Sequence, residues 1–223
     1  EWAGARAGYG VREVDGRMEG EALFAIDIDG ASDYLIGAAD GRFYHVASDA
    51  PGVTLTHLTT VDRTRGFGLL GFDGAQAELL PGSEDARVIN QAVHAGRIAL
   101  AADTLGAAQT MLDKSVAYAG ERRQFGRVIG SFQAVKHMCA EMAAALEPCR
   151  ALVWHAAHAF DAIPEEAPLL ACHVKAHLGE VGKRVARTAT EVHGGMGFTD
   201  LLGLHYWFKR IGVNRQTLRS EEH

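Results

Sequence analysis

Two segments of the sequence combine residue types that can bind a planar ligand bearing phosphate. The first is the basic, glycine-bounded run ERRQFGR at 121–127, which continues at 130–137 as GSFQAVKH. An arginine guanidinium offers phosphate a hydrogen-bonding fork, and a phenylalanine ring offers a stacking face. The second is EVHGGMGFT at 191–199, whose consecutive glycines let the backbone approach a ligand closely. Taken singly, each has an ordinary alternative: a solvated interhelical loop for the first and a glycine helix cap for the second.

Histidines and cysteines are weaker candidates for chemistry. His155 and His158, three residues apart, and His173 and His177, four apart, have the helical spacing of metal ligands. Neither pair is accompanied by an HExxH motif or a cysteine partner, as zinc sites usually are. The 3 cysteines form no CxxC pair, which favours reduced thiols in a chain without a secretory signal. We therefore expect neither a metal site nor a catalytic cysteine.

The elements that must position these segments fall into two halves of different composition. Residues 1–83 contain 14 glycines and carry 6 arginines, no lysine and 13 acids, whereas residues 84–223 carry 16 basic and 15 acidic residues. Short apolar runs in the first half are bounded by Asp15-Gly16, Asp73-Gly74 and similar turn signals, which predicts antiparallel strands. We therefore expect a β-barrel-like domain at 1–83 and a helical domain at 84–223. The expected strands are 22–28, 33–38, 43–47, 53–58 and 67–72.

The second half predicts four helices. Apolar residues recur at spacings of three and four from Ile98 to Val116, which indicates one helical face. Ser83 suits the start of this helix, and Ser131 suits the cap of the next, which we expect to kink near Pro148. Four long helices with short connections form an antiparallel bundle. The expected helices are 86–119, one beginning after 131, one ending at Gly194-Gly195, and 200–218.

Composition and charge exclude several classes of protein. The 223 residues, 48% hydrophobic and 22% charged, describe a globular chain rather than a disordered one. The sequence contains neither a stretch of 18 apolar residues nor a signal-peptide pattern, so we expect a cytoplasmic protein that does not bind membranes. Neither half is basic enough to suggest nucleic-acid binding. Because the first half is acidic, any phosphate site must be local.

The two segments are specific when they occur together and in this order. The run ERRQFGRxIGSFQAxKH followed by VHGGMGFT resembles the C-terminal helical domain of the flavin-dependent acyl-CoA dehydrogenases, while DAPGV at 49–53 and DRTR at 62–65 resemble their middle β domain. The resemblance covers essentially the whole chain. It implies an α+β multidomain fold, with an antiparallel β domain followed by a C-terminal antiparallel four-helix bundle. The N-terminal helical domain of the family is absent from this sequence, so we interpret the chain as the middle and C-terminal parts of a larger subunit.

The resemblance also implies a cofactor, FAD, bound between two subunits. One subunit's β domain contacts the flavin ring, and the neighbour's loop and helix-terminal glycines contact the adenosine diphosphate portion. The family usually has glutamine at the position of Glu191, where a carboxylate would repel a pyrophosphate unless it is protonated or turned away. The implied adenosine-side residues are Arg122, Gln124, Phe125, Gln133, Glu191, His193, Gly194 and Gly195.

The flavin-side pattern of the family is not present. A tryptophan, any residue and a threonine normally contact the isoalloxazine, whereas this chain has Phe24-Ala25-Ile26. The threonine hydroxyl hydrogen-bonds flavin N5, and the isoleucine side chain has no donor for that bond.

The catalytic base of the family is also missing from its expected places. The reaction is α,β-dehydrogenation of an acyl thioester, in which a carboxylate removes the α-proton. By resemblance, the base belongs at Gly96 or close to Leu218, with Glu221 and Glu222 just beyond. Asp103, about two turns after Gly96, is a weak candidate for a replacement base.

Adenosine-side elements are therefore retained while flavin-side and base elements are lost. This pattern predicts a non-catalytic partner subunit of a heteromeric acyl-CoA dehydrogenase, completing a neighbour's FAD site in an α2β2 assembly. The sequence pattern most resembles that of family members acting on steroid side-chain CoA esters. The resemblance also implies electron-transfer flavoprotein as electron acceptor. Two alternatives stay open: a competent homomeric enzyme, possible as a homotetramer, using Asp103 or a C-terminal glutamate, and a non-enzymatic assembly subunit.

Overall fold

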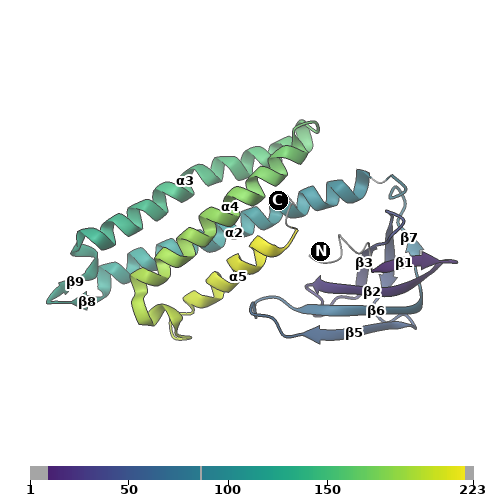
Figure 1. Ribbon diagram of the computed structural model, residues 1–223, viewed down its shortest axis with the longest axis horizontal. Helices are drawn as coiled ribbons and strands as arrows, with labels where there is room; N and C mark the ends of the chain where they lie inside the picture. Colours follow the sequence, from purple (N-terminus) through teal and green to yellow (C-terminus); the bar gives the residue numbers. More distant parts are fainter. Residues whose placement is uncertain (1–9, 86, 219–223) are drawn as a thin grey trace. The chain divides into compact units, whose positions relative to one another are not determined.

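The computed structural model describes residues 10–85 and 87–218, and the chain divides into two compact units, residues 1–93 and 94–223. Figure 1 shows strands in the first unit and consecutive antiparallel helices in the second. The predicted fold class, an antiparallel β domain followed by a four-helix bundle, is confirmed. The domain boundary that composition places after residue 83 stays a prediction.

Two antiparallel sheets form the first unit. The larger has the strand order β1-β2-β6-β5 and the smaller β3-β4-β7. Both contribute to one hydrophobic core, in which Met18, Val46 and Leu70 are almost fully buried. The strands are β1 (Val11–Val14), β2 (Arg17–Ile26), β3 (Asp33–Gly37), β4 (Phe43–Ala47), β5 (Val53–Leu58), β6 (Phe67–Gln76) and β7 (Glu78–Leu79).

The two aspartate–glycine dipeptides have different roles in these sheets. Asp15-Gly16 forms the β1–β2 turn, with both residues at positive φ (51° and 79°), as a type I′ hairpin requires. The prediction of a turn at Asp73-Gly74 is wrong, because both residues lie inside β6. Gly74, at φ 65°, sits where the pairing of β6 with β2 shifts register, so it serves a β-bulge. A glycine at positive φ suits a bulge as well as a turn, and the dipeptide alone does not distinguish them.

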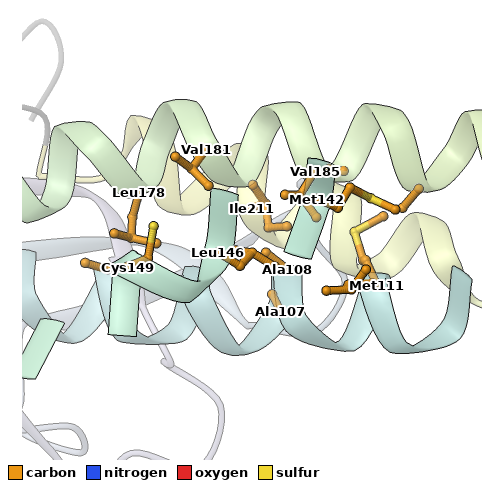
Figure 2. Close-up of a cluster of buried hydrophobic side chains, with 14 of the residues drawn as sticks. Ala107, Ala108, Met111, Met142, Leu146, Cys149, Leu178, Val181, Val185 and Ile211 are labelled. Atoms are coloured by element: carbon orange, nitrogen blue, oxygen red, sulfur yellow. The ribbon is translucent and has the colours of Figure 1, made fainter. Parts of the chain in front are cut away.

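Four long helices make up most of the second unit. Their buried faces form one core, to which Met111 of the first helix, Leu146 of the second, Leu178 of the third and Ile211 of the fourth contribute (Figure 2). The helices are α2 (Arg87–Glu121), α3 (Gln133–Ala162), α4 (Ala167–His193) and α5 (Leu204–Gln216). The short elements between them are β8 (Arg123–Gln124), β9 (Arg127–Val128) and the 3-10 turns η1 (Ile129–Ser131) and η2 (Gly194–Phe198).

Both serines expected to cap helices have other roles. Ser131 lies in η1, where its Oγ donates to the carbonyl of Val128 at 2.7 Å, and Phe132 is the N-cap of α3. Ser83 is buried and donates to the carbonyl of Leu80 at 2.7 Å. Serine hydroxyls bond to preceding carbonyls as readily as they cap helices, which is why the sequence pattern misled.

An acid rather than a serine meets the N-terminus of α2. The Asp85 carboxylate accepts a hydrogen bond from the backbone N–H of Arg87 at 2.9 Å. Within residues 10–85 and 87–218, no helix is long and apolar enough to cross a membrane.

Candidate functional site

The loop between α2 and α3 contains a β-hairpin with a two-residue turn. Strand β8 pairs with β9, and the turn residues Phe125 and Gly126 both have positive φ, 53° and 78°. This is the type I′ geometry, which asparagine and glycine usually occupy and a phenylalanine adopts only at a cost in free energy. The Phe125 side chain is 92% exposed at the tip. The hairpin therefore presents an aromatic ring to solvent from a tightly defined backbone.

Aromatic and cationic side chains make contacts near the tip of the hairpin. The Phe125 and Phe132 rings meet edge to face, with centroids 6.2 Å apart. The Arg127 guanidinium lies 3.9 Å from the centroid of the Phe132 ring, a cation–π contact. Gln124 is exposed and donates from its amide to the carbonyl of Arg123 at 2.8 Å.

Arg122 and Gln133 flank the hairpin. The backbone N–H of Arg122 donates to the carbonyl of Tyr118, and its own carbonyl accepts from Ile129, both at 2.8 Å. Its side chain is exposed, and no hydrogen bond or ion pair engages that guanidinium within the described part of the chain. Gln133, the first residue of α3, is also exposed. Both side chains are therefore accessible to a ligand.

The glycine segment ends α4 as an open cap. Gly194 has φ 57°, and its N–H donates to the carbonyl of Glu191. A Cβ built at Gly194 or Gly195 would meet no heavy atom of residues 10–85 and 87–218 within 4 Å, so these residues leave the space beside this backbone free. The side chain of Glu191 is exposed and has room to turn away from a bound anion.

His193 anchors the glycine segment to the bundle. Its ring is buried and stacks on Tyr118, with centroids 4.5 Å apart, and its Nδ1 lies 2.7 Å from the carbonyl oxygen of Ala189. Burial lowers the pKa of His193, and the charge of Lys114 acts in the same direction. The ring is therefore neutral near pH 7, with Nδ1–H donating to the carbonyl.

The stack of Tyr118 on His193 brings the two predicted segments to one end of the bundle. Tyr118 lies in the last turn of α2, just before the hairpin, and His193 is the last residue of α4, just before η2. Figure 1 shows β8, β9 and the α4–α5 connection at the same end of the helices. Sequence reasoning did not single out Tyr118, although an aromatic residue one turn before a basic loop is a usable signal for such an anchor.

Phe24 and Ile26 lie on an irregular part of β2. The register of β2 against β6 shifts between Ala22 and Ala25, and Phe24 has φ 56° within this bulge. The Phe24 ring is 59% exposed, and Ile26, opposite Phe67, is 38% exposed. The bulge thus presents apolar side chains and offers no hydroxyl at position 26.

The two expected base positions, far apart in sequence, touch each other. A Cβ built at Gly96 would lie 2.5 Å from Cδ1 of Leu218, so a leucine side chain fills the space beside this glycine. Arg97 donates from Nε to the carbonyl of Leu218 at 3.1 Å. Sequence reasoning named both positions but missed their contact and the part that Arg97 plays in it. Glu221 and Glu222 lie outside the described residues.

The Asp103 carboxylate is engaged by side chains of α5. Arg210 donates to it from both Nε and Nη2, at 2.8–3.1 Å, in a fork that is only about a quarter exposed. The Asn214 amide donates to Asp103 as well, at 2.5 Å, and also to the hydroxyl of Thr104, at 3.2 Å. A carboxylate held in this way resembles a structural ion pair more than a free proton acceptor.

Comparison with known proteins identifies the family. Residues 86–217 match the model of the acyl-CoA dehydrogenase C-terminal domain. The chain belongs to the acyl-CoA dehydrogenase family. Members of this family are FAD-dependent oxidoreductases that act on CH–CH bonds.

Individual relatives extend the match into the β unit. It is 31% identical over 210 residues to the acyl-CoA dehydrogenase IpdE2 of Mycobacterium tuberculosis, which covers 91% of this chain and 60% of that protein. A steroid ACAD, Tcur3481-Tcur3483, is 30% identical with a TM-score of 0.81 over 96% of this chain and 60% of that one. The ChsE4-ChsE5 complex of Mycobacterium tuberculosis is 26% identical with a TM-score of 0.79 over 94% and 59%. The chain thus spans about three fifths of the length of these proteins.

The chain's residues suit the adenosine end of FAD better than the flavin end. The free space beside Gly194 and Gly195, the accessible Arg122 and the exposed Phe125 ring suit the adenosine diphosphate portion. At the flavin end, the Ile26 side chain has no donor for the hydrogen bond to flavin N5 that the resemblance leads us to expect at this position.

Proposed function

We propose that this chain is the non-catalytic partner subunit of a heteromeric acyl-CoA dehydrogenase, and that it completes the FAD site of a neighbouring subunit. Its substrate class is an acyl-CoA thioester, and we assign a steroid side-chain CoA ester. An α2β2 assembly and electron-transfer flavoprotein as electron acceptor belong to the same proposal.

The roles of this chain's residues follow from their chemistry. FAD supplies the hydride acceptor for α,β-dehydrogenation when it is bound. Arg122 would hold a phosphate oxygen with its guanidinium fork, and Phe125 would stack against a planar ring. The backbone at Gly194 and Gly195 would lie against the same portion, since no side chain in the described part of the chain obstructs it there. The partner would provide the flavin contacts and the carboxylate that removes the α-proton.

One contrast carries the proposal. The hairpin and glycine cap are open and accessible, whereas the two expected base positions contain a glycine and a leucine packed against each other. Asp103, the candidate replacement, is bound by Arg210 and Asn214. A chain built in this way is suited to binding a neighbour's cofactor and unsuited to removing a proton itself.

The comparisons support the heteromeric and steroid parts of the proposal. One similar structure is a two-component complex, ChsE4-ChsE5, and another is described as a steroid ACAD. These names describe those proteins, and the proposal extends them to this chain because of the residue pattern above.

Co-expression with a glutamate-bearing partner subunit tests the proposal. The chain purified alone should bind little FAD and show no dehydrogenase activity, and both should appear in the co-purified complex. Flavin absorbance per chain and acyl-CoA-dependent dye reduction measure the two quantities. Stoichiometric FAD and turnover by the chain alone would overturn the proposal in favour of a homomeric enzyme.

A further inference from the structure

Tyr118 contacts both the hairpin and the glycine segment. Its carbonyl oxygen accepts a hydrogen bond from the backbone N–H of Arg122 at 2.8 Å, where the chain leaves α2 for the hairpin. Its half-buried ring stacks on that of His193, the last residue of α4, with centroids 4.5 Å apart and an interplanar angle of 25°. One residue of α2 thus links the two segments that contain the proposed FAD contacts.

The base of the hairpin is fixed to the last turn of α2. The N–H of Ile129 donates to the carbonyl of Arg122 at 2.8 Å, which closes the hairpin. A Cβ built at Gly130 would lie 2.8 Å from the carbonyl oxygen of Ala119, so backbone packs directly on backbone there. The position of the hairpin, and with it that of Arg122, therefore follows the position of Tyr118 and Ala119.

The glycine segment is positioned in turn by His193. The His193 ring is buried, and its Nδ1 lies 2.7 Å from the carbonyl oxygen of Ala189, one turn earlier, which fixes how the ring is oriented. The backbone of η2 folds back on the same residue, because a Cβ built at Gly197 would lie 3.2 Å from Cβ of His193 and 3.1 Å from the carbonyl oxygen of Thr190. A displacement of His193 would therefore displace Gly194-Gly195 and η2 with it.

We propose that Tyr118 is a positioning residue, which holds the glycine segment against the hairpin through His193 so that both segments reach the same FAD molecule. This inference rests on the proposed function, which assigns FAD to these two segments. Tyr118 acts through its neighbours, because its ring holds His193 while its backbone holds Arg122. Stacked aromatic rings stabilise a packed pair beyond the area that they bury, and an aliphatic side chain lacks this contribution.

Tyr118→Leu in the co-purified complex tests the positioning role. Leucine keeps apolar volume but loses the flat ring, so the dissociation constant for FAD, titrated into the flavin-stripped complex, should rise about three- to tenfold. Tyr118→Phe keeps the stack and should leave this constant nearly unchanged. Tyr118→Met, whose flexible side chain fills the space without a ring, should behave as Tyr118→Leu does and replaces it if leucine prevents assembly. Unchanged FAD affinity in both aliphatic variants would overturn the inference.

Phe160→Leu is the matched control for the loss of a ring from the bundle. Phe160 is half-buried against the bundle core near the end of α3, about 40 Å along that helix from Gln133. This variant should lower Tm and leave the dissociation constant for FAD unchanged. An equal rise of that constant in Phe160→Leu would show that FAD affinity follows the stability of the bundle, which would overturn the positioning role.

A double-mutant cycle shows whether Tyr118 acts through His193. His193→Leu removes the stack by itself and should raise the dissociation constant for FAD. If the ring contact positions the glycine segment, Tyr118→Leu should add little to that rise in the His193→Leu background, because contacting residues are not additive. The same rise in both backgrounds would overturn the inference, because Tyr118 would then act independently of His193. The proposed function fails on a different result, the absence of FAD from the unmutated complex.

Discussion

Asp103 links α2 to α5 through charge, and we expect its loss to affect stability before chemistry. Asp103→Asn keeps the shape but removes the charge that Arg210 binds, leaving a guanidinium that is only 21% exposed without its fork. Hydrogen bonds to charged groups contribute about 1.5–3 kcal/mol, so we expect a loss of roughly that size in urea unfolding. Turnover of the assembled complex should survive at temperatures where the variant is folded.

The same variant distinguishes the homomeric alternative. If Asp103 is the base, Asp103→Asn abolishes turnover in a folded protein, because an amide does not accept the α-proton. Asp161→Asn, at an exposed position near the end of α3, is the control for a carboxylate-to-amide change and should alter neither quantity.

The lowered pKa of His193 predicts how the free energy of unfolding depends on pH. Burial lowers the pKa of His193 in the folded state, so the unfolded chain takes up this proton first as the pH falls. The neutral ring makes its full contribution to the free energy of unfolding above about pH 6.5, the ordinary histidine pKa. This contribution is lost as the pH falls below that value. Burial shifts the pKa of His94 in the same direction.

His193→Gln should therefore reduce, but not remove, the decrease in unfolding free energy between pH 7.5 and pH 5.5. An equally steep decrease in His193→Gln would contradict the assignment, and His158→Gln, at an exposed histidine, is the control.

At the scale of elements, the β8–β9 hairpin depends on one glycine. Gly126 has φ 78°, and an L-residue pays about 1–2 kcal/mol there. Gly126→Ala should therefore loosen the turn that presents Phe125, and lower the FAD retained by the complex after gel filtration. Gly126→Asn is the matched control, because asparagine tolerates the left-handed region, and it should retain more FAD than the alanine variant. Equal FAD retention in both variants would show that turn geometry does not matter for the cofactor.

The elements themselves differ in how far the sequence determines them. Periodicity over many turns predicts helices well, and α2, expected at 86–119, spans Arg87–Glu121. Short strands such as β1 and β7 were missed because a few residues carry too little pattern. The roles of Ser131 and Gly74 were mistaken because each residue type serves two local structures equally well. The contacts between Gly96 and Leu218 and between Tyr118 and His193 were beyond sequence reasoning, since they join segments that only the packed bundle brings together.

On the scale of the whole molecule, the chain combines an acidic β half with a nearly neutral helical half, so attraction of an anionic cofactor must come from local charge. The hairpin segment carries such charge in Arg122, Arg123 and Arg127, and our proposal assigns the attraction to it. If the chain is only an assembly subunit, the same bundle would form the complex and the hairpin charge would be irrelevant to flavin. The two readings therefore make opposite predictions for one arginine.

Arg122→Ala separates an FAD-binding subunit from a scaffold. Both enzymatic readings predict that the complex loses flavin, because a phosphate loses its fork, and that added FAD partly restores it.

Arg122→Lys should retain less FAD than the unmutated complex and more than Arg122→Ala, since lysine keeps the charge as a single point without the fork. Arg150→Ala removes an exposed charge from α3, where the guanidinium pairs with Glu147 and donates to Gln109, and it should leave flavin absorbance unchanged. Size-exclusion chromatography must show an intact complex in every variant. Full flavin content in Arg122→Ala would leave the scaffold as the function, because the hairpin would then be retained for packing between subunits alone.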